Sequence, residues 1–318
     1  ALFFSSFLFN DSKYFKISEK ILKEELNEQI LNDGAHFELS PMYHAIFLED
    51  LLDLVNIYQA FDRSLPDNLE NKIVQMLEWL KVMSHPDGGV AFFNDSTLGV
   101  APSFIELLSY ADRLGIVFKN NQVNQLTHLV ESGYIRVEKE NMVIIADVAN
   151  IGPDYIPGHG HADALSFELS LFNKRTIVNS GISTYEMGID RDNQRSTKLH
   201  STITVDNKNS SEVWSAFRVA NRAKVFDVKK LEDSNSVEFS GCHDGYRKLK
   251  EGVLHCRHWS VSKNTITIVD NIIGKGMHKI SSVLPLHPSV VADNAQGDSI
   301  SLNVSGKRVK INFEGKGT

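Results

Sequence analysis

Two histidines and an aspartate lie close together in the chain, on a loop shaped by proline and glycine. His159, His161 and Asp163 end this loop, and residues 165–171 then alternate between apolar and polar, a pattern typical of a strand with one buried face. Imidazole groups held on a loop at the end of a sheet can act as an acid, a base or a metal ligand. For so short a motif, two solvated histidines on a polar loop are an equally good interpretation.

A second group of titratable side chains lies at a break between two predicted helices. His36, Glu38, Tyr43 and His44 surround Ser40-Pro41, which has the residue types of an N-cap and the first position of a helix. Tyr43 therefore falls in the first helical turn, where its ring can point away from the helix end. Residue types alone favour a simpler interpretation, a capped helix with a packed tyrosine.

Two arginines, a histidine and an aromatic residue form a third group. Arg191 and Arg195 can each grip a carboxylate through two parallel hydrogen bonds, and His200 precedes an alternating strand. Trp214 follows that strand, where its ring can stack on a sugar or lie in the core. Asn94 belongs to a separate turn between predicted helices. Taken singly, these segments are better explained as solvated loops and capped turns.

Three residues from separate strand edges are candidate metal ligands. His161, Asn179 and His200 can converge, and two imidazoles with one oxygen ligand suit zinc. An asparagine amide is a poorer zinc ligand than a carboxylate. The chain has no Walker loop, no GxGxxG after a strand, no GxSxG and no HExxH, so nucleotide binding and serine chemistry have no support.

The composition is that of an ordinary globular protein, with 42% hydrophobic and 23% charged residues among 318. The net charge is −7, which excludes the global basic field that nucleic-acid binding uses, although a local cluster of cations can still bind a polyanion. No apolar run reaches the length of a transmembrane helix. Cys242 and Cys256 can pair or stay free, so the compartment stays open.

The periodicity divides the chain into two parts. Apolar residues at helical spacing, separated by turn sequences, predict helical hairpins in the first part, and short alternating strands dominate from about Gly133. We therefore expect an α+β two-domain chain: helical hairpins over residues 1–118, then an antiparallel β-sandwich over residues 119–318, with a ligand cleft between them. Four or five helices are too few to close a ring, so we also expect a truncated start.

Several segments, taken together and in order, resemble the heparinase II/III family of polysaccharide lyases. The resemblance covers most of the chain and is much more specific than any one motif. The segments are 33–44, 92–96, 131–137, 157–169, 176–185, 195–206 and 212–223. The fold that the resemblance implies is an incomplete (α/α) toroid, lacking part of its N-terminal side, followed by an antiparallel β-sandwich.

The resemblance also implies a reaction, β-elimination at a uronic acid of an acidic polysaccharide. By motif, Tyr43 is the acid that protonates the leaving O4, and in one version also the base, while His159 is the partner base that takes the C5 proton. Neutralisation of the substrate carboxylate falls to an Asn or His upstream of the matched segments. Residues assigned to substrate binding are His36, Glu38, His44, Asn94, Arg191, Arg195 and Trp214.

The zinc site of some family members maps to His161, Asn179 and His200. The chain departs from the family pattern here, because Asn179 stands where an Asp is usual and Ser201 stands where an Asn usually follows the histidine. The resemblance predicts an acidic polysaccharide as partner and favours a periplasmic or secreted location over a cytoplasmic one. The net charge and the lack of a long apolar run predict no nucleic acid and no membrane insertion. The resemblance does not indicate an oligomeric state.

Two other functions remain open from the sequence. The protein can be a non-catalytic glycan-binding or surface-polysaccharide assembly protein that kept the fold. It can also be a glycoside hydrolase, which needs two carboxyl groups flanking the scissile bond. Glu38 and Asp95 are the candidates for that pair.

Overall fold

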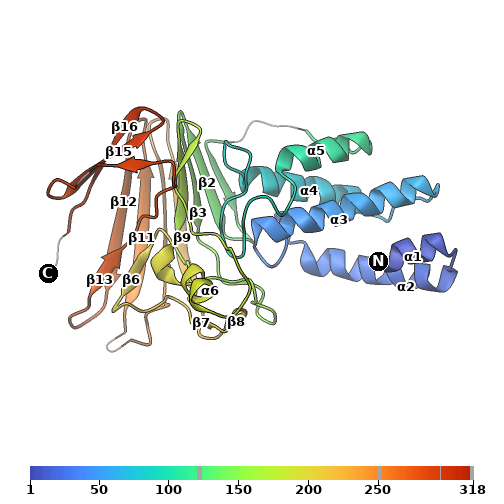
Figure 1. Ribbon diagram of the computed structural model, residues 1–318, viewed down its shortest axis with the longest axis horizontal. Coiled ribbons are helices and arrows are strands. Elements are labelled where there is room, and N and C mark those ends of the chain that lie inside the picture. The colour runs from blue at the N-terminus through green and yellow to red at the C-terminus, as the bar shows by residue number, and fades with distance from the viewer. Residues whose placement is uncertain (120–123, 250–251, 294, 316–318) are drawn as a thin grey trace.

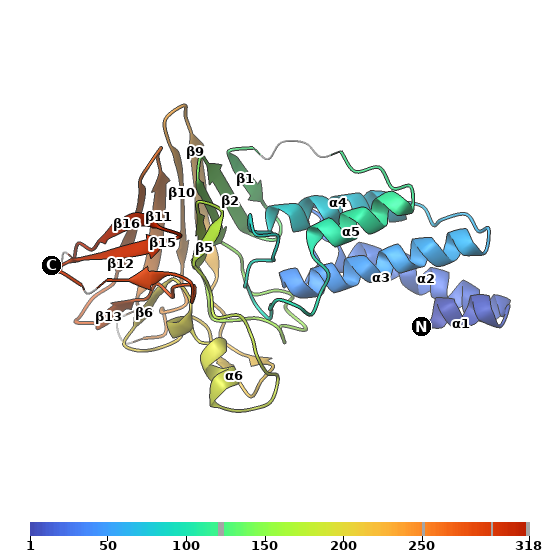
Figure 2. The same ribbon diagram turned by 45° about the horizontal axis from the view of Figure 1, so that its top comes forward.

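Helices form the N-terminal part of the molecule and project from one face of the sheets (Figures 1 and 2). The computed structural model describes residues 1–119, 124–249, 252–293 and 295–315. α3 packs against α4 and α5, and the apolar faces of the helices share one core. The helices are α1 (Leu2–Leu8), α2 (Ser12–Gln29), α3 (Pro41–Ala60), α4 (Leu69–Val82) and α5 (Phe104–Arg113).

The C-terminal part consists of antiparallel sheets. The five-stranded sheet follows chain order: β1 (Leu126–Leu129), β2 (Tyr134–Lys139), β3 (Met142–Asp147), β4 (Phe167–Leu171) and β5 (Lys174–Ile177). The four-stranded sheet has the order β12 (Ile266–Ile273), β11 (Leu254–Val261), β10 (Val237–His243) and β9 (Val225–Glu232). Smaller sheets pair β13 (Ile280–Ser282) with β6 (Ile203–Val205), β7 (Val213–Trp214) with β8 (Arg218–Val219), and β15 (Ser299–Val304) with both β14 (Val291–Ala292) and β16 (Lys307–Asn312). α6 (Ile189–Gln194) and a short 3-10 helix (Thr197–Leu199) lie between β5 and β6.

The five-stranded sheet is the middle one of three layers (Figure 1). Neighbouring side chains of β3 show this, because successive residues of a strand point to opposite faces. Ile144 lies in the core shared with Trp259 of the four-stranded sheet, whereas Ile145 lies in the core shared with Trp79 of α4. Burial on both faces explains why β3 is almost continuously apolar.

The polar face of β4 is buried as well, which corrects the prediction of a strand with one solvated face. Glu168 and Ser170 are both inaccessible to solvent. His85 from the helical part covers them, with Nδ1 2.8 Å from Ser170 Oγ and Nε2 2.8 Å from Glu168 Oε2. The alternation was predicted correctly, but the face taken as exposed is the face on which the helical part packs.

Asp33, in the turn before α3, ties the helices to the sheet. Its Oδ2 accepts hydrogen bonds from the backbone N–H groups of Glu131 (3.0 Å) and Ser132 (2.8 Å) and from Ser132 Oγ (2.9 Å). Trp79 Nε1 donates to the same Ser132 hydroxyl at 2.9 Å. The turn that leads into β2 is thus fixed to the helical part by polar contacts as well as by apolar packing.

The first part of the chain is helical, as predicted, with α1 to α5 lying between Leu2 and Arg113. The predicted domain boundary at 118/119 falls between the end of α5 at Arg113 and the start of β1 at Leu126. Among the residues described, no helix combines the length and the apolar character that crossing a membrane requires.

Cys242 and Cys256 form a disulfide between directly opposed positions of β10 and β11. The two residues are 14 positions apart in the chain, so the bridge restricts a short loop of the unfolded chain. A loop of about this size corresponds to about 3 kcal/mol of stabilisation in the chain-entropy description.

We predict that replacing both cysteines by serine lowers the free energy of unfolding by about 3 kcal/mol. Urea unfolding of the wild type and the Cys242→Ser/Cys256→Ser variant, without reductant, measures this difference. Dithiothreitol should weaken the wild type and leave the double variant unchanged. Equal midpoints for both proteins, with thiols titratable in the native wild type, would contradict the pairing.

Candidate active site

The start of α3 positions the phenol of Tyr43. Ser40 is the N-cap, and its Oγ accepts a hydrogen bond from the backbone N–H of Tyr43 (3.2 Å), with Pro41 at the first helical position. The same hydroxyl donates to the backbone carbonyl of Asp95 at 2.6 Å. The predicted capping is confirmed, and it also ties the helix start to the turn that carries Asp95.

Tyr43 and His159 come from different parts of the fold and meet ring against ring. Their ring centroids are 4.0 Å apart with an interplanar angle of 30°. Both side chains are half-buried. The Tyr43 hydroxyl donates to the hydroxyl of Tyr185 at 2.9 Å. The structure therefore brings together the phenol and the imidazole that the sequence singled out, one from the helical part and one from the sheet part.

Asp95 is the hub that holds His159 in place. Its Oδ2 lies 2.8 Å from His159 Nδ1, and its Oδ1 lies 2.9 Å from His161 Nε2. The guanidinium of Arg191 binds both oxygens, with Nη2 2.7 Å from Oδ2 and Nη1 in close contact with Oδ1. The Asp95, His161 and Arg191 side chains are fully buried, whereas His159 keeps 18% of its side chain exposed.

The charge on Asp95 is strongly stabilised. Burial alone would raise the pKa of this carboxyl group, but hydrogen bonds from His159, His161 and Arg191 outweigh burial and hold the pKa well below its usual range. A carboxylate that accepts a hydrogen bond from a histidine fixes the tautomer and orientation of the ring. His159 therefore carries its proton on Nδ1, which leaves the lone pair of Nε2 free.

A second carboxyl group lies on the other side of the His159 ring. Glu38 Oε2 is 3.7 Å from His159 Nε2 and 3.8 Å from His36 Nδ1. Burial raises the pKa of Glu38, with an opposing effect of His159. Burial, followed by the charge of His159, lowers the pKa of His36 to about 4. His36 is thus a neutral, largely buried neighbour.

Aromatic rings border the pair on its exposed side. Tyr185 and Phe217 stack at 5.7 Å between ring centroids, with an interplanar angle of 13°. The guanidinium carbon of Arg191 lies 5.2 Å from the Tyr185 ring and 5.4 Å from the Phe217 ring. Exposed aromatic rings of this kind can stack on the apolar faces of sugars. Arg191, which is bound to Asp95, lies against both rings and holds them in place. Trp214, assigned to substrate binding, is half-exposed on β7.

Five residues assigned to substrate binding are buried in the structure: His36, His44, Asn94, Arg191 and Arg195. His44 stacks on Trp79 at 4.4 Å, and its Nε2 is 2.9 Å from the carbonyl of Met76. Asn94 Nδ2 donates to the Leu39 carbonyl and its Oδ1 accepts from the His161 N–H.

The arginines that were expected to grip substrate carboxylates have other partners. Arg191 binds Asp95, as above, and its Nε donates to the carbonyl of Ala216. Arg195 donates to the carbonyls of Gly160 and Ala216. Neither guanidinium is accessible to a substrate, since Arg191 is 0% and Arg195 1% exposed. A loop sequence predicted as solvated is thus a buried anchor for the His159 loop.

A buried set of possible metal ligands lies behind His159. Within the part of the chain that the structure describes, His161, Asp163 and His200 each offer one ligand atom within 4.8 Å of the others. Asp163 Oδ2 is buried without a hydrogen-bond partner among the described residues. The amide nitrogen and oxygen of Asn179 are orphaned in the same way. The unpartnered buried oxygen of Asp163, within reach of two imidazole nitrogens, fits a bound cation.

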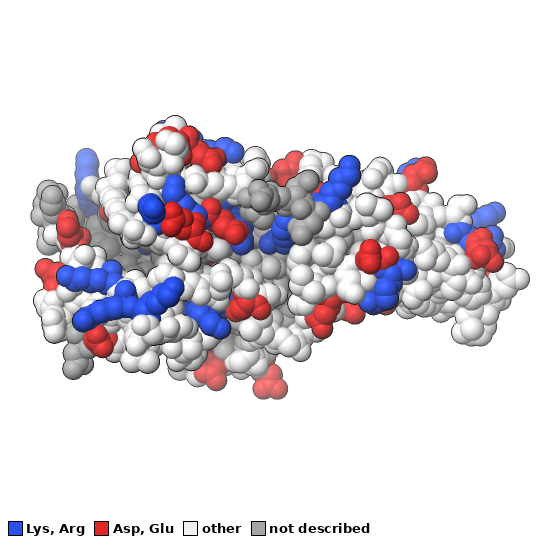
Figure 3. Space-filling view, turned by 90° about the horizontal axis from the view of Figure 1, so that it is seen from above, with Lys and Arg blue, Asp and Glu red and all other residues white. Residues whose placement is uncertain are grey.

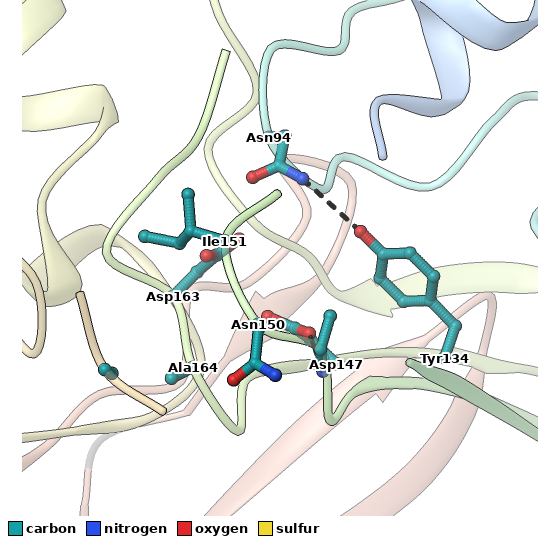
Figure 4. A pocket seen from close by; sticks show the side chains of 9 residues that line it. Asn94, Tyr134, Asp147, Asn150, Ile151, Asp163 and Ala164 are labelled. Atoms are coloured by element: carbon teal, nitrogen blue, oxygen red, sulfur yellow. Dashed lines mark hydrogen bonds between the residues drawn. The ribbon is translucent and has the colours of Figure 1, made fainter. Parts of the chain in front are cut away.

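A small cavity of about 10 Å³ adjoins this set, near the smallest volume that holds one water molecule. Figure 4 shows Asn94 and the Tyr134 hydroxyl on one side and Asp147 and Asp163 on the other. Burial, followed by the charge of Asp163, raises the pKa of Asp147 well above its usual range. The carboxyl groups of Asp147 and Asp163 thus lie close enough to influence each other in a buried part of the protein.

Two residues of the site were not assigned a role in it from the sequence. Asp95 was considered only as a hydrolase carboxylate, and Tyr185 only as part of a matched segment. The Phe-Asn-Asp-Ser sequence around Asp95 is a turn like many others, and its partners lie 64 to 96 positions away. The residues next to Asp95 in the chain therefore give no indication that its carboxylate binds several distant side chains.

Comparisons with known proteins agree with this architecture. Family models described as "Heparinase II/III N-terminus" and "Heparinase II/III-like, C-terminal" match residues 6–124 and 121–317. A heparin-sulfate lyase of Bacteroides stercoris is 25% identical over 226 residues, which are 63% of this chain and 33% of that protein. The FtsZ-localized protein C of Caulobacter vibrioides is 27% identical over 248 residues, 75% of this chain and 40% of that protein.

The fold is also that of solved structures. The heparan sulfate lyase HepC of Pedobacter heparinus superposes with a TM-score of 0.75 at 18% sequence identity. The superposition covers 94% of this chain and 48% of that one. The chain thus spans about a third of the length of the lyase relative and about half of the solved structure.

We predict that Asp95→Asn lowers the free energy of unfolding by about 3–5 kcal/mol, because it leaves the buried Arg191 guanidinium without its counter-charge. Asp154→Asn is the matched control, since Asp154 pairs with Arg222 but is 99% exposed; it should cost less than about 1 kcal/mol. Urea unfolding of both variants measures the difference. Similar midpoints for the two would show that Arg191 does not depend on Asp95.

Proposed function

Because this chain belongs to the heparinase II/III family, we propose that its protein is a polysaccharide lyase that cleaves a uronate-containing acidic polysaccharide by β-elimination. The observation that carries the proposal is the contact between Tyr43 and His159, whose rings lie 4.0 Å apart. β-Elimination needs a base for the C5 proton and an acid for the leaving oxygen. A phenol and an imidazole at the same point of the surface can share these tasks.

His159 is the proposed base. Its Nδ1 faces Asp95, so Nε2 has the free lone pair, and that nitrogen lies on the side of Glu38. The carboxylate of Asp95 stabilises the imidazolium that forms when His159 takes a proton. Hydrogen bonds from His159, His161 and Arg191 keep Asp95 itself ionised despite its burial, so the proton stays on the imidazole. Asp95 is a positioning residue in this proposal.

Tyr43 is the proposed acid. Its hydroxyl has Tyr185 as a partner in the structure, and a substrate glycosidic oxygen bound beside it would take the place of that acceptor. Negative charge on the substrate carboxylate must also be neutralised for the C5 proton to leave. The family pattern assigns this task to a residue before position 33. Stacking on Tyr185 and Phe217 would orient the sugar.

We extend the proposal to the finer architecture and location. The helical hairpins would form part of an (α/α) toroid, and the two large sheets would form a β-sandwich, as the shared core between them suggests. A periplasmic or secreted location is supported by the Cys242–Cys256 disulfide, because such bonds persist in oxidising compartments. Figure 3 shows a row of Lys and Arg side chains on the sheet half, a local cationic surface of the kind an acidic polymer would contact.

A zinc ion is part of the proposal. His161 and His200 would hold it, and the unpartnered buried oxygen of Asp163 beside them supports the fit of a cation. When bound, zinc would supply a fixed crosslink between the His159 loop and the segment that ends at His200. The proposal places no step of the elimination on the metal.

Binding without turnover is the second candidate function. It is favoured by one observation: the FtsZ-localized protein C, whose name mentions no lyase activity, matches 75% of this chain. Hydrolysis is not proposed, because Asp95 is fully buried and bonded to His159, His161 and Arg191. It cannot flank a scissile bond together with Glu38.

We predict that the full-length protein releases an unsaturated, ultraviolet-absorbing product from at least one polymer in a panel of uronate polysaccharides. Tyr43→Phe and His159→Ala should each lower kcat by about 10²- to 10⁴-fold, the usual range for loss of a general acid or base. Tyr14→Phe, an exposed tyrosine on α2, is the control and should keep full activity.

Two outcomes would contradict the lyase proposal, and a third would contradict its catalytic residues. Binding of the polymers without any absorbing product would favour the glycan-binding function. New reducing ends without absorbance would indicate hydrolysis. Full activity of both Tyr43→Phe and His159→Ala, with a lyase product present, would show that the contact between the two rings is not the catalytic centre.

A further inference from the structure

We propose that Asp163, and not Asn179, provides the carboxylate of a divalent-metal site with His161 and His200. This inference deepens the metal part of the proposed function and rests on it in that respect, but it does not depend on lyase activity. It concerns a departure of this chain, which has an amide at the position where the family pattern has a carboxylate.

The hydrogen bonds of the two imidazoles leave both facing nitrogens without a proton. His161 Nε2 is 2.9 Å from Asp95 Oδ1, so this nitrogen donates to the carboxylate. His200 Nδ1 is 2.8 Å from the backbone carbonyl of Ser196, so this nitrogen also donates. A neutral imidazole has one N–H only. The remaining nitrogens, His161 Nδ1 and His200 Nε2, therefore point their lone pairs at each other across 3.2 Å.

A second histidine pair in the same protein shows what a satisfied pair looks like. His243 Nε2 and His255 Nδ1 are 3.0 Å apart. His255 Nε2 is 2.6 Å from Asp270 Oδ1, and His243 Nδ1 accepts the backbone N–H of Gly245. One N–H of His243 therefore points at the lone pair of His255, and every nitrogen has a complementary partner. The facing nitrogens of His161 and His200 are about as close and as buried as those of His243 and His255. Neither of them carries the N–H that a hydrogen bond between the two rings needs.

A cation between the two lone pairs removes this conflict. Two nitrogens bound to tetrahedral zinc at about 2.0–2.1 Å are about 3.3 Å apart, close to the 3.2 Å observed. The outer nitrogens are bonded to a carboxylate and a backbone carbonyl, the usual partners behind metal-bound histidines. The geometry is thus that of two ligands already oriented by their supporting hydrogen bonds.

Asp163 is the residue that completes this pair. Its ligand oxygen lies within 4.8 Å of the two imidazole ligand atoms. Only 3% of the residue is exposed, and its Oδ2 has no hydrogen-bond partner among the described residues. Its carboxyl neighbour Asp147 brings no positive charge. A buried carboxyl oxygen without a hydrogen-bond partner is costly, and a bound divalent ion would give it a partner.

Asn179 has a different role in this proposal. Its backbone N–H donates to Glu168 Oε1 at 2.7 Å, which fixes the residue at the end of β5. Its amide is buried and uncharged, so it adds no charge to the site and binds a hard or borderline cation less well than a carboxylate does.

Metal binding to the full-length protein tests the proposal. The protein is stripped with a chelator and titrated with Co²⁺, whose visible absorption reports the ligand set, and then with Zn²⁺ in competition with a chromophoric chelator. The variants are Asp163→Asn, Asn179→Ala and, as a matched buried carboxyl, Asp147→Asn. Loss of a supporting partner alone costs about 10- to 100-fold in metal affinity, so loss of a ligand should exceed about 100-fold.

We expect one equivalent of Co²⁺ with a tetrahedral spectrum in the wild type, loss of more than about 100-fold in Zn²⁺ affinity for Asp163→Asn, and near wild-type affinity for Asn179→Ala and Asp147→Asn. Asp163→Glu, which keeps the carboxylate, should recover part of the affinity if Asp163→Asn folds poorly. Circular dichroism of the apo proteins monitors folding independently of metal.

Two results would overturn the proposal. If Asn179→Ala loses the metal and Asp163→Asn retains it, the amide is the ligand. If the wild type binds neither ion, the facing nitrogens share a proton instead. Because none of these measurements uses a polysaccharide, a failure here leaves the lyase proposal standing, and a failed lyase assay leaves the metal result standing.

Discussion

The buried carboxylate of Asp95 is the constraint on which the candidate site depends. It binds two imidazoles and one guanidinium through its side chain, and its backbone carbonyl accepts the hydroxyl that caps α3. The carboxylate of Asp95 therefore positions His159 and the α6 segment that carries Arg191, and its backbone carbonyl positions the start of the helix that carries Tyr43.

That arrangement requires the helical part and the sheet to form one rigid unit. The polar face of β4 contributes to this rigidity because His85 from the helical part bonds Glu168 and Ser170. Asp33 does the same at the other end of the interface through the turn at Ser132. A contact of 4.0 Å between rings from two domains can be maintained only if the interface between them does not slide.

The sequence predicts local features of this site well and long-range ones poorly. Ser40-Pro41 predicted the helix start and hence the place of Tyr43, because capping depends on neighbouring residues. The burial of Arg191 was not predicted, because it depends on a carboxylate 96 positions away. The pairing of Tyr43 with His159 came from the resemblance to a family, because the spacing of apolar residues cannot predict a contact between distant parts of the chain. Likewise, the buried polar face of β4 follows from domain packing and is invisible in its alternation.

The spacing of His159 and His161 acquires a physical meaning from Asp95. Both rings bond the same carboxylate, but His159 uses Nδ1 and His161 uses Nε2. Their free nitrogens are therefore Nε2 in His159 and Nδ1 in His161, and they face different neighbours. The first lies beside Glu38, whereas the second faces His200. In the proposed function, one anion thus divides two neighbouring imidazoles into a group that would accept a substrate proton and a group that would bind a cation. If either ring bonded Asp95 through its other nitrogen, the two free nitrogens would no longer face different neighbours, although the sequence of the motif would be unchanged.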